Sequence, residues 1–353
     1  MVRLEITVVV CTYNRAELLR GALESLVRQR TSGHLNYEVI VVDDGSADST
    51  KQVVDAYRHS SSVPIRYVSQ MHAGIAAARN RGVRESYGDW IAFFDDDQVA
   101  ECDWLFRLVE NAAAVDCVGG PYLLRLPEHC DLVLDQTLRS LLGENPGMQH
   151  EWNPPGSKVS PRRMVMPGTG NVLVRKTLFG QIGFFSEDRS YGEDREFFKR
   201  AQRAGARFAV APRAVIYHIV PPSRLTEDYL MATAAKSGQV TADIDDYKEV
   251  LWTALRRLGR ITLMTLPMIG YALLCGNHNA MLSQKCSLRY SLGYIAGVLR
   301  RSHALVLERV SGRASGQRDA TAVTRSDDQP VMNRGTACIT SVDVGPSAPG
   351  SDK

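Results

Sequence analysis

The sequence lacks the marks of several large protein classes. Its seven cysteines include no CxxC pair, which argues against a zinc site and a disulfide framework and predicts reduced thiols in the cytoplasm. The net charge is only +3, which is not the strongly basic balance that is typical of nucleic-acid-binding proteins. The first ten residues show neither the h-region nor the cleavage site of a signal peptide. No GxGxxG follows the first apolar run and no GxxxxGK(S/T) occurs, which argues against a dinucleotide-binding fold and a P-loop enzyme.

What is present is an alternation of strand and helix signals over the first hundred residues. Apolar runs at residues 6–10, 37–42, 65–68 and 90–94 predict buried strands. Helices are predicted at about 15–29, 51–57, 75–85 and 104–114. Asn14 and Glu17 resemble a capping box for the first helix, and Asp103 is predicted to cap the last. This order predicts an α/β fold with a doubly wound, mostly parallel sheet and helices on both faces.

Polar side chains follow three of the predicted strands directly. They are residues 12–15, Asp43 with Asp44, and the three adjacent acids Asp95, Asp96 and Asp97. Because parallel strands end at one edge of a sheet, we expect these groups to meet there. Three packed carboxylates repel one another, and Mg²⁺ or Mn²⁺ would relieve that repulsion with oxygen ligands. The alternative is a solvated acidic turn.

The second half of the chain contains a long irregular segment and then further strand and helix signals. Residues 143–170 are rich in Pro and Gly and include Trp152, which predicts a functional loop or lid. Asp194 precedes a predicted helix at 195–204, where an ordinary N-cap role is the alternative to a catalytic one. His218 and Arg224 follow a short predicted strand.

These motifs together resemble the family 2 glycosyltransferases. The resemblance is based on residues 8–15 (VVVCTYNR), 41–46 (VVDDGS), 77–80 (AARN) and 94–97 (FDDD). In addition, residues 192–194 (GED) are similar to the family's general-base motif. The resemblance covers residues 4–225 and implies a GT-A fold, a nucleotide-sugar donor, a divalent metal and inversion at the anomeric carbon. The QxxRW motif and the multiple transmembrane helices of the family's processive synthases are missing, so a single-addition transferase is expected.

The resemblance also implies roles for individual residues. Asp194 would be the catalytic base, with Glu193 and Trp152 on the acceptor side. Asp97 and His218 would contact Mn²⁺ or Mg²⁺. The donor site would comprise Thr12, Arg15, Asp44, Arg79, Asp95, Asp96 and Arg224. The alternatives are an Asx turn at Asp43 or Asp44, a solvent-facing Arg79, a structural His218 and a surface Arg224.

The last third of the chain changes in composition. We predict a catalytic domain at 1–225, a helical region at 226–310 and a disordered tail at 311–353. Residues 251–313 contain nine Arg and Lys residues but only one acidic residue, Glu308. Residues 261–275 are uncharged but too short to span a membrane. Interfacial binding to anionic lipid is one interpretation, and packing on the catalytic domain is the other.

The leading hypothesis is therefore a metal-dependent, inverting glycosyltransferase. Its donor would be a nucleoside-diphosphate sugar, expected to be UDP-linked, and its acceptor a glycan or a lipid-linked hydroxyl in cell-surface glycan or glycolipid assembly. The expected location is the cytoplasm, with peripheral binding at the inner face of the plasma membrane. A nucleotidyltransferase and a nucleotide-sugar-binding protein without transferase activity are the alternatives.

Overall fold

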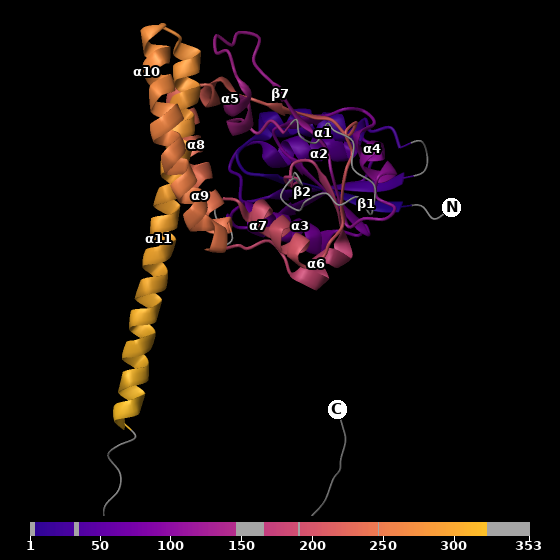
Figure 1. Cartoon of the computed structure of the whole chain (residues 1–353). Helices are drawn as coiled ribbons and strands as arrows, with labels where there is room; N and C mark the ends of the chain where they lie inside the picture. Colours follow the sequence, from indigo (N-terminus) through magenta and orange to yellow (C-terminus); the bar gives the residue numbers. More distant parts are fainter. Residues whose placement is uncertain (1–3, 32–34, 146–165, 190, 246, 323–353) are drawn as a thin grey trace, which may run out of the picture. The chain divides into compact units, whose positions relative to one another are not determined.

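The computed structural model describes residues 4–31, 35–145, 166–189, 191–245 and 247–322 (Figure 1). In this part of the chain, a seven-stranded sheet has the order β3-β2-β1-β4-β8-β6-β9, and a three-stranded sheet has the order β5-β10-β7. Strands β3, β2, β1 and β4 are mutually parallel, and β8 enters antiparallel beside β4. The strands are β1 (Leu4–Thr12), β2 (Leu35–Asp43), β3 (Ile65–Ser69), β4 (Trp90–Asp95), β5 (Gln98–Ala100), β6 (Cys117–Gly119), β7 (Tyr122–Arg125), β8 (Val172–Arg175), β9 (Phe208–Val210) and β10 (Ile216–Ile219).

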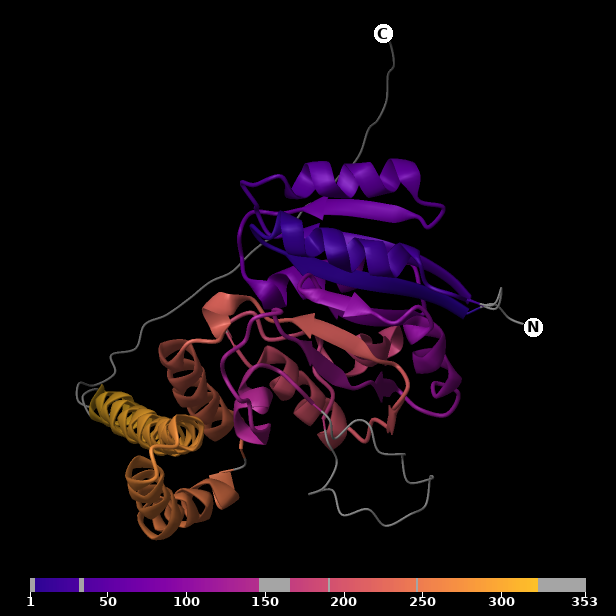
Figure 2. The same cartoon turned by 90° about the horizontal axis from the view of Figure 1, so that it is seen from above.

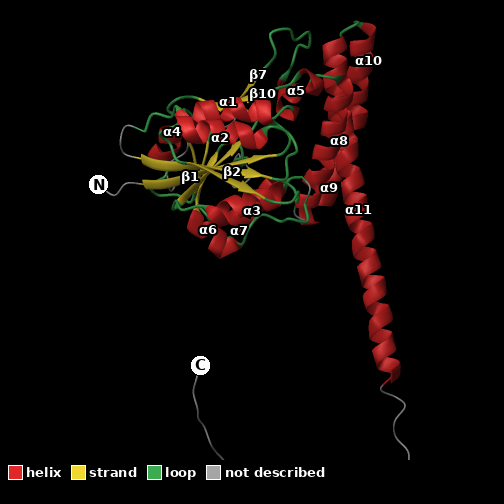
Figure 3. Ribbon diagram, turned by 180° about the vertical axis from the view of Figure 1, so that it is seen from behind, coloured by secondary structure: helices red, strands yellow, loops and turns green. Residues whose placement is uncertain are grey.

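Helices cover both faces of the large sheet, as predicted. Figure 3 shows α1, α2 and α4 on one face and α3, α6 and α7 on the other. The helices are α1 (Ala16–Val27), α2 (Thr50–Ser60), α3 (Ile75–Glu85), α4 (Trp104–Glu110), α5 (Gln136–Leu141), α6 (Lys176–Ile182), α7 (Glu193–Arg203), the 3₁₀ turn η3 (Pro222–Arg224), α8 (Glu227–Ile244), α9 (Tyr247–Arg260), the π-helical turn η4 (Ile261–Thr265), α10 (Leu266–Leu274) and α11 (His278–Ala322).

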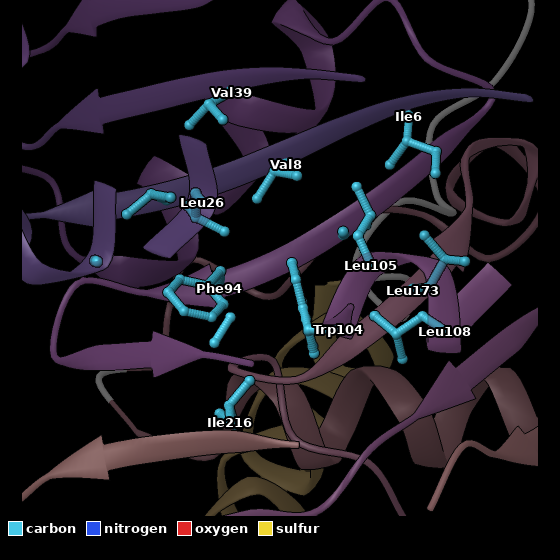
Figure 4. Packing of buried hydrophobic residues seen from close by; sticks show 14 of the residues in the cluster. Ile6, Val8, Leu26, Val39, Phe94, Trp104, Leu105, Leu108, Leu173 and Ile216 are labelled. Atoms are coloured by element: carbon cyan, nitrogen blue, oxygen red, sulfur yellow. The ribbon is translucent and has the colours of Figure 1, made fainter. Parts of the chain in front are cut away.

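Two apolar cores follow from the alternation of side chains along the central strands. Val8 and Val10 of β1 pack under α1, α2 and α4, whereas Val9 and Cys11 pack against α3 on the opposite face. Figure 4 shows Val8, Phe94 and Trp104 in the first of these cores. The second core is rich in phenylalanine from α6 and α7. Because both faces are buried, the strands are fixed in register and the residues at their ends are placed firmly.

The structure corrects the expectations about three helix starts in different ways. Asn14 is not a helix cap, since it has φ 52° and its side chain accepts a hydrogen bond from the Ala47 amide at 2.8 Å. Asp48 Oδ2 instead accepts from the Ala16 amide, the first residue of α1, at 3.0 Å. Asp103 occupies the predicted N-cap position of α4, but its side chain pairs with Arg107 and makes no capping hydrogen bond. Asp194 is not the N-cap of α7 but lies in its first turn, after Gly192.

The predicted C-terminal helical region consists of separate helices. Helix α8 ends at Ile244, and α9 starts separately at Tyr247. The predicted tail begins inside α11, which continues to Ala322. Compact units are Met1–Arg301 and Ser302–Lys353, so the boundary predicted at residue 225 falls inside the first unit. In Figure 2 the orange helices α8, α9 and α10 lie beside the yellow helix α11, with which α8 and α9 share apolar contacts.

Part of the helical region packs on the N-terminal part of the chain. Leu138 and Leu142, at and after α5, share an apolar cluster with Leu230 of α8 and with Leu282 and Cys286 of α11. The described part of the chain contains no helix that is both long and apolar enough to cross a bilayer.

Candidate active site

The carboxyl ends of the parallel strands meet at one edge, as expected. The register places Thr12 beside Asp43 and Cys11 beside Asp95. Asp43 in turn lies beside Ser69 at the end of β3. The polar segments that follow β1, β2 and β4 are therefore brought together by sheet pairing rather than by closeness in sequence.

Asp97 is surrounded by basic side chains from three parts of the chain. Its Oδ2 lies 3.3 Å from His218 Nε2, 3.2 Å from Arg224 Nη2 and 3.4 Å from Arg15 Nη1. The small sheet creates this cluster, because antiparallel pairing of β10 with β5 places His218 opposite Gln98, and the Ile219 amide donates to the Asp97 carbonyl at 2.8 Å. Arg224 Nη1 also lies 2.9 Å from His218 Nε2.

The three adjacent acids have different electrostatic surroundings. Burial and the charge of Asp97 raise the pKa of Asp96 to about 6, although Arg15 and Thr12 oppose the shift. Burial and the same neighbouring charge also raise the pKa of Asp95, opposed by Arg79. Burial would raise the pKa of Asp97 too, but His218, Arg224 and Arg15 outweigh it and hold that pKa below its ordinary value. Asp97 is thus the acid of the three that stays charged most readily.

Thr12 and Arg15 border the same acids. Arg15 Nη1 is 3.1 Å from Asp96 Oδ1, and the Arg15 side chain remains 43% exposed. The Thr12 hydroxyl is buried next to Asp96 but forms no hydrogen bond of standard geometry. A buried hydroxyl without a protein partner and a half-exposed guanidinium are both available to a bound ligand.

Asp44 organises the loop that follows β3. Its carboxylate accepts hydrogen bonds from the Ala73 amide at 2.9 Å, the Gly74 amide at 2.8 Å and Gln70 Nε2 at 2.7 Å. His72 Nδ1 lies 2.9 Å from the same carboxylate. Asp44 is therefore buried and shapes this end of the site, while the Asx-turn role falls to Asp43, whose Oδ1 accepts from the Ser46 amide.

The sequence analysis missed an aromatic pair above Asp44. The rings of Tyr13 and His72 stack with centroids 4.2 Å apart and an interplanar angle of 24°. Both side chains are exposed, at a point where a planar group could be bound. The aromatic residue directly after the first strand was the available signal.

Arg79 does not face solvent. Its guanidinium lies 3.3 Å from Asp95 Oδ1 and also pairs with Glu193, so that it joins α3, the end of β4 and the start of α7. The Arg79 and Glu193 side chains are 8% and 7% exposed. Burial raises the pKa of Glu193, with a further contribution from Asp194, while Arg79 opposes the shift. Glu193 thus points inward toward Arg79, which fixes the start of α7.

Asp194 lies beside a glycine segment that separates it from Asp95. A Cβ on Gly168 would lie 2.7 Å from Tyr122 Oη and 3.7 Å from Asp194 Oδ2. A Cβ on Gly170 would lie 2.6 Å from Asp95 Oδ2 and 3.0 Å from Tyr122 Cε1. A Cβ at either position would collide with Tyr122, and burial together with the charges of Asp95 and Asp194 raises the pKa of that tyrosine. The Asp194 carboxylate itself accepts from the Arg195 amide at 2.7 Å.

The side chains of Asp97 and His218 fit a hard divalent cation that takes few protein ligands. Within the described ranges, no group of three or more His, Cys, Asp or Glu is assembled as a metal cage. Mg²⁺ is typically bound by one or two carboxylates together with substrate phosphates and water. A charged Asp97 with His218 beside it meets that requirement. Of the predicted site residues, Trp152 lies outside the described residues.

Comparisons with known proteins agree with the sequence-based resemblance. The family described as "Glycosyl transferase family 2" matches residues 7–153. The succinoglycan biosynthesis protein ExoM of Rhizobium meliloti is 32% identical over 241 residues, which cover 67% of this chain and 74% of that protein. The chondroitin synthase of Escherichia coli is 28% identical over 248 residues. The match covers 63% of this chain but only 36% of that longer protein.

A solved structure supports the fold. The mannosyltransferase PcManGT from Pyrobaculum calidifontis, in complex with GDP-Man and Mn²⁺, superposes with a TM-score of 0.58 at 18% identity, over 84% of this chain and 88% of that one. At this identity the likeness concerns the fold alone. It confirms the predicted GT-A architecture, and the identity and coverage of the ExoM match show the family. The chain belongs to glycosyl transferase family 2.

Proposed function

We propose that this glycosyltransferase inverts the anomeric centre of a nucleoside-diphosphate sugar, expected to be UDP-linked, while transferring the sugar to an acceptor hydroxyl. The supporting observation is that Asp44 and Asp97 follow β2 and β4, which pair with β1 on its two sides, while Asp95 at the end of β4 and Asp194 both lie near Tyr122. Each lies where one part of such a donor or its acceptor would be handled.

The donor site would extend along this edge. Asp44 and the Tyr13–His72 stack would receive the nucleobase, and Thr12, Arg15 and Asp96 the ribose and first phosphate. Asp97 and His218 would hold Mn²⁺ or Mg²⁺, which would stabilise the negative charge on the departing diphosphate. Arg224 would bind the diphosphate oxygens, since its guanidinium already lies at Asp97.

The chemical step would be a single in-line displacement. The acceptor oxygen attacks the anomeric carbon, the bond from that carbon to the diphosphate oxygen breaks, and the acceptor proton passes to Asp194. The Arg195 amide orients the Asp194 carboxylate for this task. Glu193 would act through Arg79 by fixing the first turn of α7 between donor and acceptor. A base of this kind contributes roughly 10²–10⁴-fold to the rate.

The acceptor would be a glycan or a lipid-linked hydroxyl in cell-surface polysaccharide or glycolipid assembly. The name of the relative ExoM, a succinoglycan biosynthesis protein, supports polysaccharide assembly. We place the enzyme in the cytoplasm, at the inner face of the plasma membrane, on the strength of its unpaired cysteines and its basic, apolar C-terminal helices.

A donor-binding and turnover experiment tests this function. Calorimetry of the full chain with UDP-sugars and GDP-mannose, with Mn²⁺ or EDTA, measures donor affinity, and nucleotide release in the presence of acceptor measures turnover. Asp194→Asn should bind donor like the wild type but lose at least ~100-fold in turnover. Asp188→Asn, at an exposed carboxylate before α7, is the control. Normal turnover in Asp194→Asn would remove this base from the mechanism, and tight binding without turnover in the wild type would indicate a binding protein.

A further inference from the structure

The helices α9, η4 and α10 carry a dense set of exposed apolar side chains, which we name the α9–α10 face. Eleven of the twenty large hydrophobic side chains that are exposed in the described residues belong to it. They are Leu251, Trp252, Leu255, Leu258, Leu263, Met264, Leu266, Met268, Tyr271, Leu273 and Leu274. Single exposed hydrophobic residues are normal, but a continuous set of this size marks an interaction surface.

The helical backbone does not break between α9 and α10, so one continuous helical segment carries these exposed side chains. Residues at the junctions keep helical dihedral angles, with φ −64° and ψ −39° at Arg260 and φ −65° and ψ −45° at Leu266. Leu263 is 80% exposed and Leu274 is 89% exposed. Burying apolar side chains is favourable, so a partner that covered several of these would bind strongly.

The charges on these helices indicate which partner fits. Between residues 250 and 301 the sequence contains no Asp or Glu, whereas Arg and Lys recur. Arg256 and Arg260 are exposed on α9 among the apolar side chains. Arg257 instead packs over the rings of Tyr290 and Tyr294, which ties α9 to α11. The available surface is therefore apolar and cationic.

We propose that the α9–α10 face docks in the plane of an anionic lipid bilayer. Apolar side chains would enter the boundary between headgroups and acyl chains, Trp252 and Tyr271 would lie at headgroup depth, and Arg256 and Arg260 would contact lipid phosphates. A second copy of the chain fits less well, because a symmetric contact would bring two sets of the same arginines together. The proposal rests on the proposed function, since it gives the enzyme a workplace where a lipid-linked acceptor would lie.

Sedimentation with lipid vesicles tests the proposal on the full chain without any nucleotide sugar. We expect binding to phosphatidylcholine vesicles that contain phosphatidylglycerol, and weaker binding in high salt. Leu263→Ser with Leu274→Ser should reduce partitioning at least ~10-fold, because each exposed side chain contributes on this scale. Val133→Ser is the matched control, since Val133 is 69% exposed on a different segment. Arg256→Ser with Arg260→Ser should abolish the preference for anionic vesicles.

Three results would overturn the proposal. They are absence of vesicle binding, vesicle binding that the double leucine variant leaves unchanged, and a dimer in light scattering that the double leucine variant dissociates while vesicles are ignored. The last result would assign the face to a second copy. Because the readout is partitioning, a failure here is distinguishable from a failure of transferase activity.

Discussion

Replacing Arg79 by Gln is the change that separates two roles for this arginine. The family resemblance implies a donor contact, whereas the structure places the guanidinium against Glu193 and Asp95. Removing one partner of a buried ion pair typically costs 3–5 kcal/mol, because the remaining charge stays buried without compensation. Arg79 and Glu193 are both less than a tenth exposed, so we expect Arg79→Gln to lose about 3–5 kcal/mol of unfolding free energy at pH 8.

The loss should depend on pH with a definite sign. The pKa of Glu193 is already raised by burial, and losing Arg79 removes the charge that opposes the shift. An acid whose pKa is higher in the folded state than in the unfolded state costs no stability below its unfolded pKa. The cost grows as pH rises toward the folded pKa. The loss in Arg79→Gln should therefore be smaller at pH 5 than at pH 8, and adding Glu193→Gln should restore at least ~1 kcal/mol.

Urea unfolding followed by circular dichroism at both pH values measures these differences. Arg81→Gln is the matched control, because Arg81 lies on the same helix with 47% of its side chain exposed and pairs with Glu85 on the surface. Its effect should stay within about 0.5 kcal/mol. A loss below ~1 kcal/mol in Arg79→Gln, or an equal loss at both pH values, would refute the bridging role. Unchanged stability with a raised KM for the donor would assign Arg79 to donor binding.

Two further predictions concern stability. Asp96→Asn should raise the unfolding temperature at pH 7.5, because the pKa of about 6 means that the charged form is disfavoured in the folded state. The gain, up to about 3 kcal/mol, should disappear as pH falls to 4, and a gain that is independent of pH would contradict the assignment. Gly293→Ala should cost about 1–3 kcal/mol, because its Cβ would collide with the Ala235 carbonyl where α8 packs on α11. Gly259→Ala, with nothing within 4 Å of its Cβ, should be neutral or stabilising in the same thermal scan.

The central strands, and the sheet edge where their polar ends meet, could be predicted from local sequence patterns. Continuous apolar runs such as residues 6–10 and 90–94 specify strands that are buried on both faces. Polar residues that follow such parallel strands must then lie at one edge of the sheet. This reasoning is local in origin, since burial and periodicity are properties of short segments. It failed at helix starts, where Asp48 caps α1 from 32 residues away in place of Asn14.

Only the tertiary structure decided how the site is held together. Arg79 and Glu193 are 114 residues apart in the sequence, and no local sequence pattern predicts that they form a buried ion pair. His218 reaches Asp97 because β10 pairs antiparallel with β5, and Gly168 and Gly170 matter because of what surrounds their missing side chains. The exposure of the α9–α10 face also depends on tertiary packing. Residues of α8 and α11 are buried in a cluster with α5, whereas the apolar side chains of this face stay exposed. Short-range periodicity sets which elements form, whereas long-range packing and the low dielectric of the interior set which charges meet.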